Sequence, residues 1–256
     1  MKLLYIKIWS CLLLCLLDGT KSYALDSTDA PRRPDYGSVA VKAQRFFKYG
    51  EWPNAAAMYE LMLEERPKVC DTYAHAIVTA GMRSMPDYEI ALAEKAQANL
   101  VPLDSLLQGV RRVSFSLGQT SRYEHFLLLL KERQPWLGRS IDKQLLRYYL
   151  FRRNGPGIIR YSRIMLSGAP DNADFMLALA QGLLLTGDYD EAVATYKALL
   201  DLHPDNYTAL LYLGNYYRDK GASEEAIRYL QRAKELKATP YVDGMLASLT
   251  RGTDKK

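Results

Sequence analysis

Apolar positions recur along the chain at the three- and four-residue spacing of amphipathic helices. In residues 187–206, GDYDEAVATYKALLDLHPDN, apolar side chains occupy one face between a glycine that stops one helix and a proline that stops the next. No stretch shows the period-two alternation that marks a half-buried strand. The pattern therefore predicts an all-α protein.

The same pattern recurs 34 residues further on as GASEEAIRYLQRAKELKATP, residues 221–240. The segments that precede the two stretches, 173–186 and 207–220, also correspond. The matched positions include the turn glycine and the small residues of the two helices: Gly187 with Gly221, Ala192 with Ala226, and Ala180 with Gly214. Self-similarity at this period predicts stacked units, each made of a helix, a tight turn and a second helix.

Residues 36–69 repeat the pattern, with Ala43, Gly50, Ala55, Tyr59 and Pro67 at the matching positions. The middle of the chain is degenerate but has the right length. The predicted units are therefore 36–69, 70–103, 104–137, 138–172, 173–206 and 207–240. In the second unit we expect Ala91 and Ala98 to be the small residues, displaced by about two positions. In the fourth, RRNGPGI breaks the helix one residue late. Residues 25–35 are expected to be a flexible arm, and residues 241–256 a partial capping helix with a frayed tail.

This pattern resembles the tetratricopeptide repeat family, in which small residues near the middle of the first helix and early in the second let the helices approach closely. The resemblance covers residues 36–240 in period, and its motifs are specific in the first, fifth and sixth units. It implies a right-handed α-solenoid of about six helix-turn-helix units. A nonspecific helical bundle is the alternative, although it does not predict small residues that recur in register.

Residues 1–24 have the features of a signal peptide. Lys2 and Lys7 precede the apolar run CLLLCLL, and Ser22 and Ala24 stand at the small-residue positions before a cleavage site, so Leu25 is the expected mature N-terminus. The protein is therefore predicted to be exported and to be periplasmic or envelope-associated. An uncleaved leader that anchors the chain in the membrane is the main alternative, and a lipoprotein is a weaker one.

The distribution of reactive residues argues against an enzyme. His75, His125 and His203 lie in different units, and none has a second ligand at metal-binding spacing. Beyond the leader the only cysteine is Cys70, and the chain has no phosphate-binding glycine loop and no nucleophile elbow. We expect no catalytic residues, no metal and no cofactor.

The family resemblance implies that the first helix of each unit lines a concave groove. We expect this groove to bind a protein or an extended peptide, which polar amides, aromatic rings and cations can hold by its backbone and its carboxylates. At the inward positions of the family the sequence has Gln44, Phe47, Lys48, His75, Gln108, Arg112, Phe115, Arg139, Lys143, Tyr149, Gln181, Tyr212, Asn215 and Arg218. Some members clamp a C-terminal carboxylate with a lysine and asparagine pattern, of which only Asn215 is present, so we do not expect that activity.

Charge is unevenly distributed. The whole chain has a net charge of +5, whereas residues 104–163 contain 12 Lys and Arg against Asp104, Glu124, Glu132 and Asp142. This asymmetry indicates an acidic partner, with an anionic membrane surface or another copy of the chain as alternatives. Nucleic acid is not expected for an exported protein. The predicted function is a non-enzymatic interaction scaffold. The alternative is an assembly or chaperone-like factor for outer-membrane or secretion machinery.

Overall fold

The computed structural model describes residues 35–253 and contains thirteen α-helices and one short 3-10 helix in that range. The predicted all-α architecture is confirmed there, and this range holds no strand. The helices are α1 (Tyr36–Lys48), α2 (Trp52–Glu65), α3 (Cys70–Met82), α4 (Pro86–Ala98), α5 (Leu103–Ser116), α6 (Thr120–Arg133), η1 (Pro135–Leu137), α7 (Gly138–Arg152), α8 (Gly155–Ser167), α9 (Ala173–Thr186), α10 (Tyr189–Leu202), α11 (Tyr207–Asp219), α12 (Ser223–Leu236) and α13 (Pro240–Thr253).

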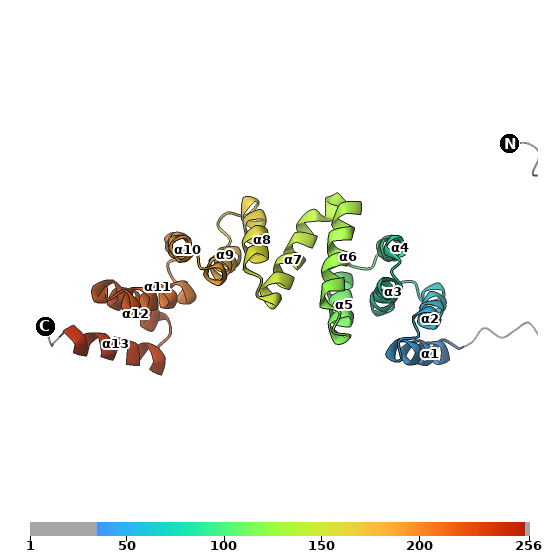
Figure 1. Ribbon diagram of the computed structural model, residues 1–256, viewed down its shortest axis with the longest axis horizontal. Helices are drawn as coiled ribbons and strands as arrows, with labels where there is room; N and C mark the ends of the chain where they lie inside the picture. The colour runs from blue at the N-terminus through green and yellow to red at the C-terminus, as the bar shows by residue number, and fades with distance from the viewer. Residues whose placement is uncertain (1–34, 254–256) are drawn as a thin grey trace, which may run out of the picture.

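The helices follow one another in pairs along an arch (Figure 1). α1, α3, α5 and α9 lie toward its concave side, and α2, α4, α6, α8 and α10 lie toward its convex side. The predicted signal peptide and arm, up to residue 34, lie outside the described residues. No helix within residues 35–253 is long and apolar enough to cross a membrane.

Each of the six helix pairs turns at a residue with positive φ. Four of these residues are glycines and two are not: Gly50 (73°), Ser84 (57°), Gly118 (69°), Arg153 (51°), Gly187 (87°) and Gly221 (75°). A left-handed residue ends the first helix and reverses the chain within a few residues, and glycine adopts this conformation without a Cβ clash. The positions are separated by 34, 34, 35, 34 and 34 residues. The repeat therefore continues through the degenerate middle of the chain.

Small residues let paired helices approach closely where the sequence repeat is most regular. Ala43 and Ala55 are fully buried in α1 and α2, and so are Ala180 and Ala192 in α9 and α10. A Cβ added to Gly214 of α11 would lie 2.7 Å from two side-chain carbons of its partner helix α12, which is too close for any other residue without a shift. The structure therefore places the predicted small residues at close helix contacts.

Larger side chains occupy the equivalent place in the middle pairs. The fifth residue after the left-handed turn residue is a buried alanine in α2, α10 and α12. The same position holds Glu89 in α4, Tyr123 in α6 and Ile158 in α8, and all three are buried. α5 and α6 accordingly approach each other less closely than α1 and α2 do. A tyrosine ring at this position takes the space that a methyl group fills elsewhere.

The small residues of α4 are not the ones expected. Ala93 and Ala96 are fully buried, whereas Ala91 and Ala98 are exposed. The prediction of Ala91 and Ala98 was therefore wrong. Residues 93 and 96 are three apart and share one helix face, and that face is the one α4 turns toward the core.

α7 has one residue more than its counterparts before the turn. Its left-handed residue, Arg153, stands 35 residues after Gly118, and Asn154 then caps α8 by accepting a hydrogen bond of 2.8 Å from the backbone N–H of Gly157. This is the late break predicted from RRNGPGI. One extra residue turns a helix by about 100°, so inward positions counted from the start of α7 do not match those counted from its turn.

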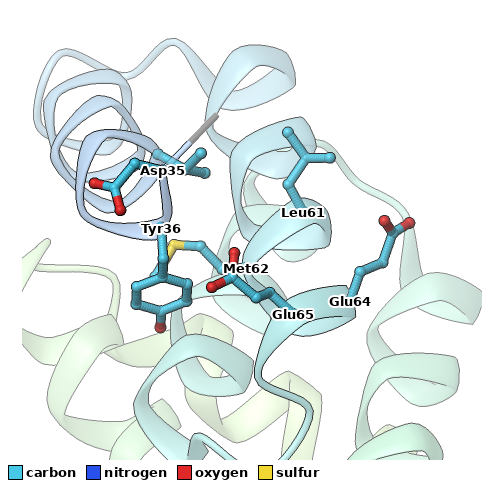
Figure 2. Close-up of a pocket in the computed structure, with 7 residues that line it drawn as sticks. Asp35, Tyr36, Leu61, Met62, Glu64 and Glu65 are labelled. Carbon is cyan, nitrogen blue, oxygen red and sulfur yellow. The ribbon is translucent and has the colours of Figure 1, made fainter. Parts of the chain in front are cut away.

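The two ends of the arch differ in how they are covered. At the C-terminal end Val242, Met245 and Leu249 of α13 are buried against α12. At the N-terminal end, within the described residues, no helix precedes α1, and α3 packs on the other side of this pair. Figure 2 shows the pocket left there, lined by Asp35, Tyr36, Val39, Leu61, Met62, Glu64 and Glu65.

The cost of the left-handed turn can be measured at Gly187, where an added Cβ meets nothing within 4 Å. Gly187→Ala is expected to lower the free energy of unfolding by about 1–2 kcal/mol through backbone strain alone. Gly244 is the matched control, because it also has open space but lies inside helix α13. Gly244→Ala should raise stability by roughly 0.5–1 kcal/mol. The free energies of unfolding are measured by urea denaturation. A change in the same direction for both substitutions would contradict the strain argument.

Glu89 makes stability depend on pH. It is only 6% exposed, and burial raises its pKa from 4.5 to about 7, although Arg122 nearby lowers it. The folded state therefore binds more protons than the unfolded state between these values, so stability falls as pH rises from about 4.5 to about 7 and is flat above. At about 1.4 kcal/mol per pKa unit the loss is roughly 3 kcal/mol.

Glu89→Gln is expected to remove this slope. The measurement is the free energy of unfolding of both proteins at several pH values. Glu64→Gln, on the exposed side of α2, is the control and should keep the slope. A slope that persists in Glu89→Gln would assign the pH dependence to another group.

Candidate functional site

The candidate site is the inner face of the arch, which we define as the solvent-accessible side chains of α1, α3, α5, α7, α9 and α11. Of the predicted contact residues, those that the structure leaves exposed are Gln44, Lys48, Gln108, Arg112, Arg139, Lys143 and Gln181. Those that are half-buried are Phe47, His75, Phe115, Tyr149, Tyr212, Asn215 and Arg218. Their neighbours show which of them belong together.

The N-terminal part of the inner face brings Phe47 of α1 and His75 of α3 together. Their ring centroids lie 5.0 Å apart in an edge-to-face arrangement. Tyr59 of α2 completes the cluster at 5.6 Å from His75. Its hydroxyl is buried without a hydrogen-bond partner among the described residues, and burial, followed by the charge of Asp71, raises its pKa. The rings hold the first two helix pairs in a fixed relation.

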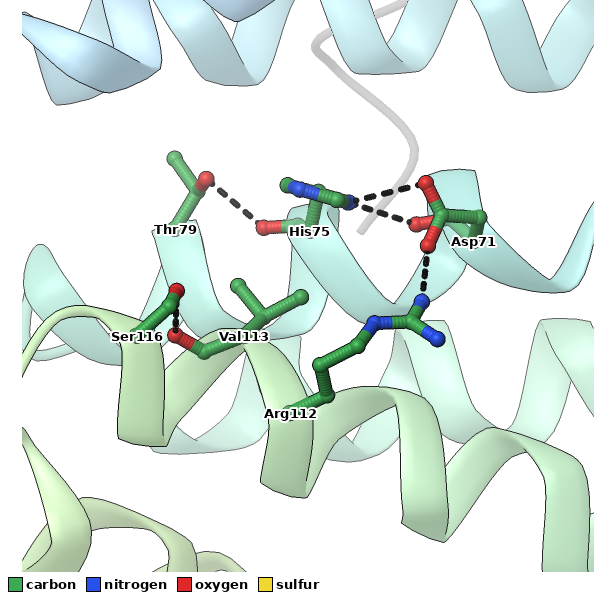
Figure 3. A network of polar contacts seen from close by, with 6 residues as sticks. All are labelled: Asp71, His75, Thr79, Arg112, Val113 and Ser116. Atoms are coloured by element: carbon green, nitrogen blue, oxygen red, sulfur yellow. Dashed lines mark hydrogen bonds and ion pairs between the residues drawn. The ribbon is translucent and has the colours of Figure 1, made fainter.

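A polar network continues this region onto α5 (Figure 3). His75 Nδ1 lies 2.9 Å from the backbone oxygen of Asp71 and 3.4 Å from its carboxylate. Arg112 reaches across from α5 and pairs with the same carboxylate. Arg112 and Asp71 are 68% and 58% exposed, so their pairing contributes less than about 1 kcal/mol to stability. A guanidinium held this weakly is available to a ligand carboxylate.

The middle of the inner face is aromatic and cationic. Phe115 of α5 lies 4.9 Å from Phe151 of α7, and Arg111 lies over the Phe115 ring at 5.9 Å from its centroid. Phe151 is 61% exposed. Arg147, one turn before it on α7, is also exposed. Of these residues, sequence reasoning had named only Phe115.

The predicted set lacks Arg147 because of the register of α7. The residue six positions before each left-handed turn is Gln44, Val78, Arg112, Arg147, Gln181 and Asn215 in the successive first helices. Inward positions of α7 had been counted from residue 138 and not from the turn. The late break in RRNGPGI was the signal that could have found Arg147.

Tyr149 was predicted to lie on the inner face, and the same register shift turns it away from that face. Its ring stacks on Tyr161 of α8 at 5.4 Å, and its hydroxyl donates to the carboxylate of Glu124 on α6. Burial raises its pKa, and Glu124 raises it further. Tyr149 therefore packs on the second helices of the arch, and the structure does not bring it together with Phe115 and Arg147.

Arg139 and Lys143 lie near the N-terminal end of α7 and not with the aromatic residues. They line a shallow pocket with Asp104, Asn172 and Phe175, next to the loop between α8 and α9. Arg139 also donates to the carbonyl oxygen of Gly168, at 3.5 Å. Both cations remain exposed, so they form a second positive region on the same helix.

The C-terminal part of the inner face is covered in part by α13. Asn215 accepts a hydrogen bond of 3.2 Å from the hydroxyl of Tyr241 on α13 and donates one of 3.0 Å to the carbonyl oxygen of Leu211. Arg218 pairs with its neighbour Asp219 at 2.8 Å. These two predicted contact residues are therefore engaged within the chain, and the open part of the inner face runs from α1 to α9.

Tyr212 repeats the arrangement seen at His75. It stacks on Tyr196 of α10 at 4.3 Å, and burial raises the pKa of Tyr196 to about 12. Tyr59 and Tyr196 hold equivalent places in their helices, as do His75 and Tyr212. In both cases a tyrosine of a second helix joins its unit to the first helix of the next.

Few groups suited to metal binding or catalysis occur in the part of the chain that the structure describes. No group of three or more His, Cys, Asp or Glu residues there could hold a metal ion. Cys70 is half-buried, and burial and then Asp71 raise the pKa of its thiol, which disfavours the reactive thiolate. The expectation that the protein needs no cofactor stays a prediction.

The regular C-terminal pairs can be compared with a known family. Residues 177–242 match the tetratricopeptide repeat (TPR) family. The match spans most of α9, all of α10 to α12 and the start of α13, so the resemblance predicted for the fifth and sixth units is confirmed there. No curated protein is significantly similar to this chain in sequence.

Solved structures show the same type of fold. A protein from Bacteroides ovatus is similar with a TM-score of 0.50 and 16% identity, over 73% of this chain and 99% of that one. The C-terminal part of a TPR protein from Cytophaga hutchinsonii has a TM-score of 0.47 and 15% identity, over 80% of each chain. In the structure of Naa15/Naa10 bound to HypK-THB, with a TM-score of 0.49 and 16% identity, the match covers 86% of this chain but only 35% of that one. At these identities the likeness concerns the fold alone.

Proposed function

We propose that this protein is a non-enzymatic scaffold that binds a protein or an extended peptide along the inner face of its helical repeats. The observation that carries the proposal is the series of side chains six residues before the turns. Gln44, Arg112, Arg147 and Gln181 are polar and exposed at this place on four of the five first helices of the open face, whereas α3 has the buried Val78 there. Repeat proteins use such extended concave surfaces for binding.

The side chains of this face suit a polypeptide ligand. Glutamine amides can donate to and accept from the backbone of an extended peptide, and aromatic rings such as Phe151 offer apolar contact. The frame that carries them is rigid, because consecutive pairs are joined by buried ring contacts such as Tyr59 with His75. A rigid face lowers the entropic cost of binding. The TPR match of residues 177–242 supports the same function.

The charge of the middle pairs favours an acidic partner. Of the 12 basic residues in 104–163, four have a carboxylate within 4 Å in the described structure: Arg112, Lys131, Arg133 and Arg163. Three of those carboxylates, Asp71, Asp87 and Glu191, come from neighbouring pairs. The other eight basic residues form no ion pair within residues 35–253. Their positive potential would attract acidic peptides and be screened by salt.

Export to the cell envelope is the second part of the proposal, and it rests on the sequence of residues 1–24. We expect the protein to fractionate with the periplasm or the envelope and the mature chain to begin at Leu25. N-terminal sequencing of the protein purified from its native host tests this. A chain that retains Met1 in the membrane fraction would indicate an uncleaved anchor, and an intact chain in the cytoplasm would contradict export.

Binding along the inner face can be tested with a random peptide library displayed on phage and selected on the full chain. Selected peptides that carry a benzophenone group are expected to cross-link to α1, α3, α5, α7 and α9. Gln181→Glu should weaken the binding of acidic peptides several-fold, because the new carboxylate repels theirs. Gln231→Glu on α12, also an exposed glutamine, is the matched control and should change affinity less than about twofold.

Two outcomes would contradict the proposal. Selection could yield no binding peptide, or the cross-links could map to the convex helices. Binding of many unrelated unfolded chains without sequence preference would instead favour the chaperone-like alternative.

A further inference from the structure

The N-terminal end of the arch carries a pocket that is separate from the predicted contact residues of the inner face. It has a volume of about 400 Å³ and opens between the start of α1 and the end of α2 (Figure 2). Its lining consists of four apolar or aromatic residues and three carboxylates: Tyr36, Val39, Leu61 and Met62, and Asp35, Glu64 and Glu65. A ligand can therefore bind here independently of the inner face.

The second helix pair shows what fills the equivalent space. Val39 of α1 and Tyr73 of α3 each stand eleven residues before the left-handed turn residue of their pair. The Tyr73 ring is fully buried. Its hydroxyl donates to the carbonyl oxygen of Lys95 at 3.4 Å and accepts a hydrogen bond of 3.1 Å from the side-chain amide of Asn99. A valine side chain does not reach that far, so the first pair has a pocket at this place.

The lining of the pocket supports this correspondence. Leu61 and Glu65 of α2 stand 34 residues before Lys95 and Asn99, and both line the pocket. The two groups that hold the Tyr73 hydroxyl therefore have counterparts here, a backbone carbonyl oxygen and a carboxylate. Both counterparts are hydrogen-bond acceptors, so a phenol O–H that enters the pocket can donate to either of them. The lining favours a tyrosine ring over a phenylalanine ring.

The carboxylates of the pocket are not neutralised within the described residues. Glu64 and Glu65 are exposed, and neither they nor Asp35 form an ion pair within residues 35–253. The adjacent cation, Arg66, lies over the Tyr36 ring at 3.9 Å from its centroid. Three carboxylates around one small pocket produce a negative potential that attracts a cation.

We infer that this pocket is a docking site for a tyrosine side chain of a partner protein, followed or preceded in the partner by a lysine or arginine. The ring packs on Val39 and Met62, the hydroxyl donates to Glu65, and the neighbouring cation pairs with Glu64. The partner thus supplies the ring that Tyr73 supplies within the second pair. This site selects a basic segment, whereas the ligand proposed for the inner face is acidic, so the inference goes beyond the proposed function and does not depend on it.

Other classes of ligand fit the pocket less well. An anionic lipid surface would be repelled by the three carboxylates. No group of His, Cys, Asp or Glu side chains within the described residues is arranged to hold a metal ion. A tyrosine next to a cation satisfies both the apolar lining and the charge.

The test uses an array of octapeptides in a Gly-Ser background that carry every pairwise combination of natural residues at the two central positions. The full chain is expected to retain peptides with Tyr next to Lys or Arg. Affinities of soluble copies are then measured by fluorescence anisotropy. Replacing Tyr by Phe should weaken binding about fivefold through loss of the O–H donor, and replacing Lys by Glu should weaken it at least tenfold. Equal binding of the Tyr and Phe peptides, or no binding of either, would overturn the assignment.

Val39→Phe places a ring of the chain itself in the pocket. We expect peptides with Tyr next to Lys to bind this variant at least tenfold more weakly. The free energy of unfolding in urea should be unchanged or higher, because the new ring is buried as Tyr73 is. Undiminished peptide binding by the folded variant would show that the peptide docks elsewhere.

Glu65→Gln tests the carboxylate without filling the pocket. It should weaken the peptides with Tyr next to Lys about fivefold. Glu225→Gln is the matched control, because Glu225 lies on α12, is exposed and forms no ion pair in the described structure. It removes the same charge and should change affinity less than about twofold. Similar losses in the two variants would indicate long-range attraction alone and refute the site.

Two further measurements identify other occupants. Tyr49 follows Lys48 and is 68% exposed, so a second copy of the chain could supply the same pair of side chains. Sedimentation velocity is expected to show a monomer, and a dimer that is lost in Tyr49→Ala would assign the pocket to a second copy. A rise in peptide affinity in Arg33→Gln would assign it to the N-terminal segment of the chain itself. Either result would overturn docking of a separate partner.

Discussion

The structure depends on the inability of one helix pair to bury its own apolar surface. Each pair is completed by the next, and the contact recurs at equivalent places, as in Tyr59 with His75 and Tyr196 with Tyr212. Because this contact joins a second helix to the following first helix, it uses one side of each first helix. From α1 to α9 the opposite side keeps accessible side chains and forms the inner face, whereas α13 covers part of it at the C-terminal end.

The middle pairs keep this architecture while their side chains diverge. The left-handed turn residues preserve the period through Ser84 and Arg153, although neither is a glycine. Glu89 and Tyr123 stand where other pairs have a buried alanine, and they are buried with polar groups that a simple core would not contain. A buried carboxyl with a raised pKa and an orphaned hydroxyl both reduce stability. Such costs are common where a protein keeps residues for binding.

The inner face is bounded at its two ends in different ways. At the C-terminal end the hydroxyl of Tyr241 on α13 donates to Asn215, so this residue of the inner face is already hydrogen-bonded within the chain. At the N-terminal end the pocket between α1 and α2 remains open among the described residues. Between these ends, Arg112 is held by an exposed pairing with Asp71 and Arg147 is not paired. The free cations therefore concentrate in the middle of the arch.

The period of small residues, glycines and apolar positions was enough to predict the helical-repeat fold, because regular burial requires those residues at regular places. It also placed Phe47, His75 and Phe115 on helices whose faces do meet. Inward positions of α7 that are counted from residue 138 include Tyr149 and miss Arg147, because the added residue before the turn rotates the helix face by about 100°. The sequence alone could not show that Asp71 meets Arg112, 41 residues away, or that Asn215 meets Tyr241. Spacing determines which residues share a helix face, but only the packing of one helix on another decides which of those faces stays open and which charges remain unpaired.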